Sequence, residues 1–308
     1  MKRYWLCLLL TLPLWADVAI DRKTDQIDVT VDGKPFTSFF FGPDTMKPFL
    51  APLRAADGTI VTRRWPMESN IEGESHDHPH HTGLWFTHDD VNGVKFWENP
   101  KPGPDIGRVV LDRIDKTRGG NRTGVIEADF RWEGPDNKVI LREHRKMTFY
   151  SDPENRIIDI DITLRPNREP VKFGDTKEGT FGIRLADKMT EKQKGGMMTN
   201  AAGQTGMKAV WGKPSPWVDY AGTLDGKPVG VAIFDHRENP KHPTYWHARD
   251  YGLFAANPFG EKDFFRDKTR DGSLTIQPGK SLRFRYRVII HPGLTANTPL
   301  AEMYSKYR

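Results

Sequence analysis

Apolar and polar side chains alternate along much of this 308-residue chain with a period of two. That period is typical of β-strands that turn one face to a core and the other face to solvent. Residues 27–32 and 158–162 are clear examples, since isoleucine or valine alternates there with aspartate or threonine. The dipeptides Asp32-Gly33, Asp57-Gly58 and Asp225-Gly226 predict tight hairpin turns beside such runs.

Further runs of this kind predict strands at 36–41, 108–117, 124–132, 139–150, 229–234, 253–257 and 282–291. The polar segment 188–204 predicts a long loop. The tail has helical features, because Thr298 could cap a helix, Pro299 could occupy its first turn and Leu300 begins an apolar face. The pattern therefore predicts an all-β fold, a large antiparallel sandwich or barrel with a short C-terminal helix.

The first residues have the features of an export signal. Lys2 and Arg3 precede an apolar run at 4–15, and Ala16 offers a small residue for cleavage. We therefore predict a signal peptide over residues 1–16 and a periplasmic or secreted location for the mature protein.

The remaining residues, 17–308, are predicted to form a single domain without a membrane span. No later apolar run approaches the roughly 20 residues that a spanning helix needs. The formal charge of +5 falls to +3 without the two leader cations, and basic residues are interleaved with acidic ones, so nucleic acid is not an expected partner. The one cysteine, Cys7, lies in the leader, which leaves the mature chain without a disulfide or a thiol nucleophile.

Histidine is concentrated in one short stretch, since five of the ten histidines lie within residues 76–88. Imidazole changes its charge near neutral pH and is a common metal ligand. A flat strand would place alternate histidines on one face, whereas a polyproline-like repeat of three would align His78 with His81. The stretch could supply metal ligands, for which His78, His80 and His81 are the candidates, or proton-transfer groups, or only stacked structural rings.

A second cluster, Asp175-Thr176-Lys177-Glu178, places two carboxylates and an ammonium between two glycines. Carboxylates in such a setting suit acid–base chemistry on glycosides, although charged hairpin tips have the same composition. His144 lies in the middle of a predicted strand, on a polar face that either meets solvent or forms the floor of a binding cleft.

A third cluster combines aromatic and charged side chains. It contains Asp235-His236, His242 and the run Trp246-His247-Ala248-Arg249. Aromatic rings beside charged donors suit a sugar, whose ring has apolar faces and a hydroxyl rim, but the same rings could simply pack in a core.

These motifs together resemble those of domain family of unknown function 6807, DUF6807, which is also labelled a "methane oxygenase PmoA" family. The matching residues are His78-Pro79-His80-His81-Thr82-Gly83-Leu84-Trp85, Asp90-Val91-Asn92-Gly93, Asp175-Thr176-Lys177-Glu178-Gly179, Trp246-His247-Ala248-Arg249-Asp250-Tyr251-Gly252 and Asn257-Pro258-Phe259-Gly260. The methane label does not fit this chain, because the methane monooxygenase subunit of that name spans the membrane several times.

The resemblance implies a galactose mutarotase-like β-supersandwich that binds sugars on a concave sheet. In mutarotases of that fold, histidine acts as the acid and glutamate as the base. The expected function is therefore a secreted carbohydrate-active enzyme of the glycoside hydrolase, lyase or mutarotase/epimerase type, acting on a carbohydrate or another small polar substrate.

The site residues follow from this analogy. The expected catalytic residues are His78 or His81 with His144 as proton donors and Glu178 as the acceptor. The expected substrate-binding residues are Trp85 and Trp246 against the sugar ring, Lys177 and Arg249 at hydroxyls or a carboxylate, and Asp175, Asp235, His236 and His247. This prediction requires the three clusters to line one hollow on a single curved β surface.

Two other classes of protein remain open. One is a non-catalytic carbohydrate-binding protein that uses the same cleft. The other is a metal-dependent enzyme with the histidine-rich stretch as ligands. No cofactor is expected for the acid–base enzyme, whereas the second alternative requires a divalent metal.

Overall fold

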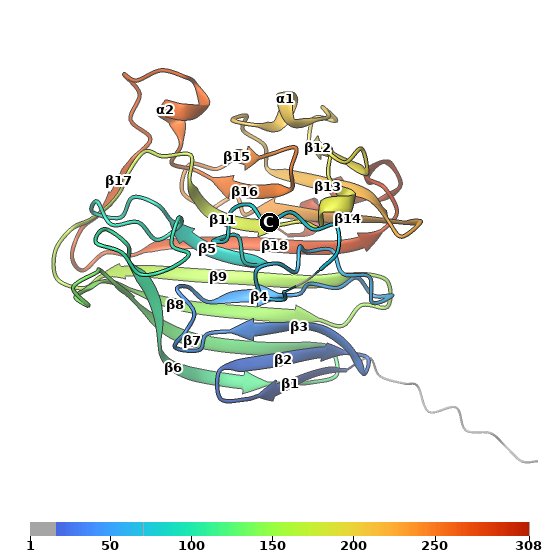
Figure 1. Ribbon diagram of the computed structural model, residues 1–308, viewed down its shortest axis with the longest axis horizontal. Helices are drawn as coiled ribbons and strands as arrows, with labels where there is room; N and C mark the ends of the chain where they lie inside the picture. The colour runs from blue at the N-terminus through green and yellow to red at the C-terminus, as the bar shows by residue number, and fades with distance from the viewer. Residues whose placement is uncertain (1–16, 70, 308) are drawn as a thin grey trace, which may run out of the picture.

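Two large antiparallel sheets pack face to face in a computed structural model that describes residues 17–69 and 71–307 (Figure 1). Each sheet has eight strands, and a two-stranded sheet lies beside them. This architecture confirms the predicted all-β supersandwich. The predicted signal peptide lies on residues 1–16, outside the described residues.

The first sheet contains, in spatial order, β1 (Val18–Arg22), β2 (Gln26–Val31), β3 (Lys34–Phe40), β4 (Phe49–Ala51), β5 (Leu84–His88), β11 (Gly179–Arg184), β16 (Leu253–Asn257) and β15 (Tyr245–Ala248). The second contains β12 (Gly196–Asn200), β13 (Trp217–Leu224), β14 (Lys227–Asp235), β18 (Leu282–Pro292), β9 (Arg156–Pro166), β8 (Val139–Tyr150), β7 (Thr123–Glu133) and β6 (Arg108–Arg118). The small sheet pairs β10 (Val171–Phe173) with β17 (Leu274–Ile276).

The helices are short: η1 (Asp187–Met189), α1 (Met207–Val210), α2 (Glu261–Phe264), η2 (Thr295–Asn297) and α3 (Leu300–Lys306). The C-terminal helix α3 confirms the helix predicted for the tail. Leu300 anchors α3 by packing in a buried cluster with Trp217 and Phe234. Its N-cap is Pro299 rather than the predicted Thr298. No helix among the described residues is long and apolar enough to cross a membrane.

The alternating pattern arises because one face of each strand packs between the sheets. In β9, Ile158, Ile160 and Ile162 are buried in the core, whereas Asp159 and Asp161 point outward. At the hairpin between β2 and β3, Asp32 and Gly33 have φ values of 54° and 72°. Positive φ at both central residues is the geometry of a type I′ turn, whose twist matches that of the strands.

The predicted long loop at 188–204 is wrong in part, because it contains strand β12. Met198 of β12 is fully buried, while Met197 is half exposed, so the strand does alternate. Its five residues pair with β13 at the edge of the second sheet. A strand of five residues is too short for the period of its apolar side chains to distinguish it from a loop.

The central strands of the first sheet are buried on both faces. All residues of β5, β11 and β16 are buried. In β5, Leu84 and Phe86 face the second sheet, while Trp85 belongs to a separate cluster with Trp97 on the other face. Connecting loops therefore cover this outer face of the first sheet, and the candidate site lies there.

Candidate functional site

The strand register aligns the site residues in rows across the outer face of the first sheet. In the central row, Trp85 of β5 pairs with Gly182 of β11, Gly182 with Ala255 of β16, and Ala255 with His247 of β15. A Cβ at Gly182 would lie 2.6 Å from the ring of Trp97, so only glycine admits that ring here. Small residues in the middle of the row thus leave room for the rings of Trp85 and Trp97 to pack on this face.

The histidine-rich stretch forms a turn instead of the predicted strand or polyproline segment. His78 has a φ of 45°, and the amide of His81 donates to the carbonyl of His78 at 3.0 Å. The turn places the ring of His78 flat against that of His81, with centroids 4.8 Å apart and planes at 4°. His78 also stacks on Tyr251, and His81 stacks on Trp85. The rings form a continuous stack from Tyr251 at the surface to Trp85 in the interior.

Burial keeps the inner histidines of this stretch neutral. Burial, with Lys47 and other nearby cations, lowers the pKa of His80 to about 3. The pKa of His81 is well below its ordinary value, through burial and then the repulsion of His80 and Arg184. Arg184 donates to His81 Nδ1 at 3.4 Å, so Nε2 carries the proton of the neutral ring. That Nε2–H is buried and has no partner among the described residues.

Two buried arginines hold the turn in place. Arg63 donates to the carbonyls of Asp77 and His78 at 2.8 and 3.0 Å, and to the carboxylate of Asp77 at 2.7 Å. Arg184 reaches the same carboxylate at 2.8 Å and the hydroxyl of Ser75 at 3.0 Å. Their side chains are 0% and 1% exposed. Asp77 thus compensates two buried guanidinium groups and ties the turn to β11.

The Lys177–Glu178 cluster meets the third cluster at the opposite end of the central row. Lys177 pairs with Glu178 at 2.6 Å, and His247 Nδ1 lies 4.0 Å from the Glu178 carboxylate. His247 Nδ1 donates to the carbonyl of Lys177 at 2.6 Å, which leaves the lone pair of the neutral ring on Nε2. Burial lowers the pKa of His247 to about 4. His247 is therefore neutral beside an ion-paired carboxylate.

Asp89 adds a second carboxylate to this part of the site. Its backbone amide donates to the carbonyl of Glu178 at 3.0 Å. Burial raises the pKa of Asp89 to about 6, and repulsion from Glu98 and Glu178 acts in the same direction. Lys47 interacts electrostatically with Asp89. Burial lowers the pKa of the Lys47 ammonium to about 7. The pKa values of Asp89 and Lys47 therefore both lie near neutrality.

Arg249 and Tyr251 belong to the turn that joins β15 to β16. The Arg249 guanidinium carbon lies 5.9 Å from the ring centroid of Tyr251, and Arg184 lies 4.8 Å from it. Burial raises the pKa of Tyr251 to about 12, so its hydroxyl stays protonated at neutral pH. The turn thus carries a cation and a hydrogen-bond donor to the surface side of His78.

Members of all three predicted clusters therefore lie on one face, namely His78, His81, Glu178, His247 and Arg249. Lys177 lies with them and is partly exposed.

His144 does not join them. It lies on β8 of the second sheet. Leu141 and Met147, on the opposite face of the same strand, point into the core. His144 Nδ1 lies 2.8 Å from the carboxylate of Asp129 on the outer surface of the second sheet. The polar face of β8, which suggested the floor of a cleft, is a solvated surface on the side of the sandwich opposite the candidate site. The prediction of His144 as a proton donor in that site is therefore wrong.

The tryptophans also differ from the prediction. Trp246 is 0% exposed, stacks on Phe254 and donates to the carbonyl of Ser215, so it packs in the core and cannot face a sugar. Trp85 is on the correct face but lies beneath His81 and is 1% exposed. Tyr251, which sequence reasoning did not select, is the aromatic ring at the surface of the stack.

Three other predicted binding residues have structural roles. Asp175 accepts from the amides of Lys262 and Gly272 and so fixes the loop before Glu178. Asp235 is fully buried and accepts from Asn239, His242 and Thr244 at 2.7 to 2.9 Å. His236 packs on Tyr307 at the end of β14, in the second sheet. Asp235 and His236 therefore lie outside the site.

The candidate metal ligands His78, His80 and His81 do not form a ligand set. The rings of His78 and His81 are parallel and stacked, so their nitrogens do not converge on one point. In the described part of the chain, the group whose ligand atoms come within 4.8 Å of one another is Asp115, Asp129 and His144. Arg113 already pairs with both of those aspartates.

Sequence reasoning missed Lys47, Arg63, Arg184 and Tyr251 and did not single out Asp89. Arg184 offered the clearest signal, because it interrupts the apolar run Phe181–Leu185 in a strand that is buried on both faces. A charged side chain in such a strand requires a partner in the interior.

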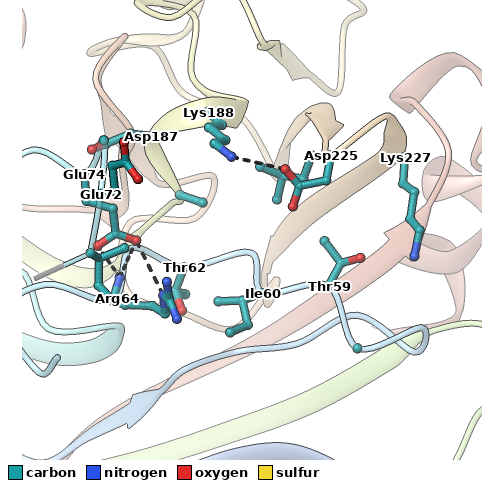
Figure 2. A pocket seen from close by; sticks show the side chains of 15 residues that line it. Thr59, Ile60, Thr62, Arg64, Glu72, Glu74, Asp187, Lys188, Asp225 and Lys227 are labelled. Carbon is teal, nitrogen blue, oxygen red and sulfur yellow. Dashed lines mark hydrogen bonds and ion pairs between the residues drawn. The ribbon is translucent and has the colours of Figure 1, made fainter.

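A separate pocket of about 400 Å³ is lined by Arg64, Glu72 and Glu74 on one side and by Lys188, Asp225 and Lys227 on the other (Figure 2). Glu74 on its wall accepts from the amides of Arg64 and Trp65 at 2.8 to 3.0 Å. Lys188 and Asp225 pair across its rim at 3.2 Å. Most charged groups of this pocket have partners, since Lys227 also pairs with Asp57 at 2.8 Å, so the pocket is a weaker candidate than the outer face of the first sheet.

Acidification is expected to destabilise this fold between about pH 6.5 and pH 4. Burial lowers the pKa of His80 to about 3 and of His88 and His247 to about 4, whereas an unfolded chain protonates histidine near pH 6.5. The unfolded state then binds more protons, and each histidine lowers the free energy of unfolding by up to about 1.4 kcal/mol per pH unit.

Asp89 acts in the opposite direction between about pH 6 and 4, because its raised pKa lets the folded state bind a proton first. Urea unfolding at pH 7, 6 and 5 measures the sum. The variant His88→Gln should have a shallower dependence on pH than the wild type. A free energy of unfolding that is flat over this range would contradict the assignment of neutral buried histidines.

The fold and the site define an antiparallel β-sandwich protein with titratable side chains gathered on the outer face of one sheet. The chain belongs to the family described as a family of unknown function (DUF6807), whose model matches residues 26–305. This confirms the resemblance drawn from the motifs. A comparison with curated proteins finds no match.

Several solved structures are similar in fold. An α-galactosidase from Lactobacillus brevis has 9% identity and a TM-score of 0.44, over 90% of this chain and 40% of its own. A galactose mutarotase-like protein from Clostridium acetobutylicum has 10% identity and a TM-score of 0.44, over 90% of this chain and 99% of its own. A heparan sulfate lyase mutant from Pedobacter heparinus has 10% identity and a TM-score of 0.41, over 92% and 36%.

This chain thus spans 40% of the length of the α-galactosidase. Identities of 9 to 10% and TM-scores of 0.41 to 0.44 identify neither a substrate nor a reaction.

Proposed function

We propose that this protein is a carbohydrate-active enzyme that acts on a sugar by acid–base chemistry, with Glu178 as the proton acceptor and Asp89 as the proton donor. The observation that carries the proposal is the contrast between these two neighbouring carboxylates. Glu178 is ion-paired with Lys177, whereas burial raises the pKa of Asp89 to about 6. Carboxylates in contrasting environments divide the roles of base and acid between them.

The histidines take a different role from the one expected from the sequence. His81 is neutral and presents an Nε2–H that lacks a partner, and neutral His247 has its lone pair on Nε2. A neutral imidazole is a poor proton donor but a good hydrogen-bond partner for hydroxyl groups. His81 and His247 would therefore orient the substrate while the carboxylates move protons.

The kinds of side chain on this face support a sugar as the substrate. Tyr251 offers a partly buried ring beside the cation of Arg249 and the half-exposed ring of His78. Sugars present apolar C–H faces and a rim of hydroxyl groups to such combinations of rings and donors. The proposed reaction needs no cofactor, and the leader at residues 1–16 supports a periplasmic or secreted location.

The proposal is tested by turnover of a sugar panel as a function of pH. Because Asp89 must carry a proton to act as an acid, kcat/KM should fall as the pH rises above about 6. Asp89→Asn should lower kcat/KM by about 10²- to 10⁴-fold and abolish this limb of the profile. The exposed residue Asp136, on a loop of the second sheet, provides the matched control Asp136→Asn.

Saturable sugar binding without a product would favour a non-catalytic binding protein over the enzyme. Turnover that disappears on chelation, with stoichiometric metal in the purified protein, would favour the metal-dependent alternative.

A further inference from the structure

The guanidinium of Arg249 stands apart from the other buried or partly buried arginines of the site. Arg63 and Arg184 each contact the Asp77 carboxylate, at 2.7 and 2.8 Å. Arg249 has no hydrogen bond or ion pair from its guanidinium to any residue that the structure describes, and its Nε is buried. A buried donor without a partner costs free energy that a ligand can recover.

The position of Arg249 directs this charge towards the candidate site. Arg249 follows β15 and is two residues from His247, so the two side chains point to the same face of the sheet. Trp246 and Ala248 point to the other face, into the core. The Arg249 amide donates to the carbonyl of Leu253, which fixes the turn in which it lies. Arg249 therefore extends the row of side chains that contains His247.

Two carboxylates of this face are engaged with other cations. Glu178 pairs with Lys177 at 2.6 Å, and Asp77 is shared by Arg63 and Arg184. Neither carboxylate lies within 4.0 Å of the Arg249 guanidinium. The positive charge of Arg249 is thus not compensated by an adjacent acid of the described chain.

On the same face, the Nε2–H of His81 is a second donor without a partner among the described residues. Donors without matching acceptors favour a ligand that carries acceptor oxygens.

We infer that the substrate of this site is an acidic sugar, a uronic acid residue, whose carboxylate is bound by Arg249. The inference rests on the proposed function, because it concerns the same site. A planar guanidinium matches a carboxylate in a bidentate arrangement, which a neutral hydroxymethyl group cannot form. The exposed edge of the His78 ring, whose two faces stack on Tyr251 and His81, would then lie beside the sugar that carries this carboxylate.

Paired ligands test this inference directly. Methyl β-glucuronide and methyl β-glucoside differ at one carbon, as do the corresponding galacturonide and galactoside, and binding is measured by calorimetry or NMR titration at low salt. We expect at least one uronide to bind about tenfold or more tightly than its neutral partner, in line with a charge-assisted hydrogen bond. Arg249→Gln should reduce this preference to about one, and Arg249→Lys should retain part of it.

The exposed residue Arg118, on β6 of the second sheet, provides the control Arg118→Gln, which should keep the full preference. Equal or tighter binding of the neutral sugars, or a uronide preference that survives in Arg249→Gln, overturns the inference. Preference for sulfated sugars over uronides also overturns it, because that result identifies another anion.

The outcome separates this inference from the proposed function. The uronide preference is measured by binding to the wild type and Arg249→Gln, whereas the proposed function is measured by turnover that requires Glu178. If neutral sugars are turned over in a reaction that requires Glu178, the enzyme stands and the uronic acid inference fails. If no sugar is bound or turned over, both fail.

Discussion

Replacement of Glu178 by glutamine is expected to abolish sugar turnover while the protein remains folded. Glutamine has the shape of glutamate but cannot accept a proton, and general base catalysis typically contributes about 10²- to 10⁴-fold to a rate. Since Glu178 is also the negative partner of Lys177, its loss frees a cation beside the reacting group. We therefore expect kcat to fall by about 10³-fold or more, at the upper part of that range.

The fold should tolerate this change. The Lys177 side chain is 40% exposed, and exposed ion pairs contribute about 0 to 1 kcal/mol to stability. The control is Glu302→Gln, which removes the exposed Lys306–Glu302 pair on α3 and should leave turnover unchanged. Unchanged kcat in Glu178→Gln would show that this carboxylate is not the base.

Replacement of Arg63 by methionine is expected to lower the free energy of unfolding by about 3–5 kcal/mol, as found when one partner of a buried charge network is removed. The side chain of Arg63 is 0% exposed. It donates to the carbonyls of Trp65, Asp77 and His78 at 2.8 to 3.0 Å. Methionine satisfies none of these acceptors and leaves Arg184 to neutralise Asp77 alone.

Arg64→Met is the matched control, because the Arg64 side chain is 35% exposed and forms only loose pairs, with Glu68 at 3.4 Å and Glu74 at 4.0 Å. It should cost less than about 1 kcal/mol. Urea unfolding at pH 7 measures both variants. Since Arg63 holds the turn that carries His78 and His81, Arg63→Met should also weaken sugar binding, and equal stability of the two variants would contradict its role as the anchor of the turn.

The sequence also indicated which residues meet, although not all of them. His81, Glu178 and Arg249 were predicted to share one face, and they do because β5, β11, β16 and β15 are neighbours in one sheet. His144 was placed with them because its strand also has a polar face. Alternation identifies a polar face but does not identify the sheet to which the strand belongs.

The arginines illustrate why part of the site escaped prediction. Arg63 and Arg184 are separated by more than a hundred residues and meet at Asp77, which pairs with both. Nothing within a few residues of either arginine indicates this shared partner. Trp246 shows the reverse case, since a tryptophan among polar residues resembled a sugar platform until the register placed it in the core.

By itself, the sequence determined the period of two, the glycine turns and the β-sandwich class, because these depend on residues that are close along the chain. The tertiary structure decided which strands became neighbours, which face of each strand met solvent, and which charges were buried together. Those outcomes depend on strand pairing between distant segments, where a shift of one residue would turn every side chain to the other face. The pKa of Asp89 and the unpaired charge of Arg249 arise in the same way, from neighbours that only the folded chain provides.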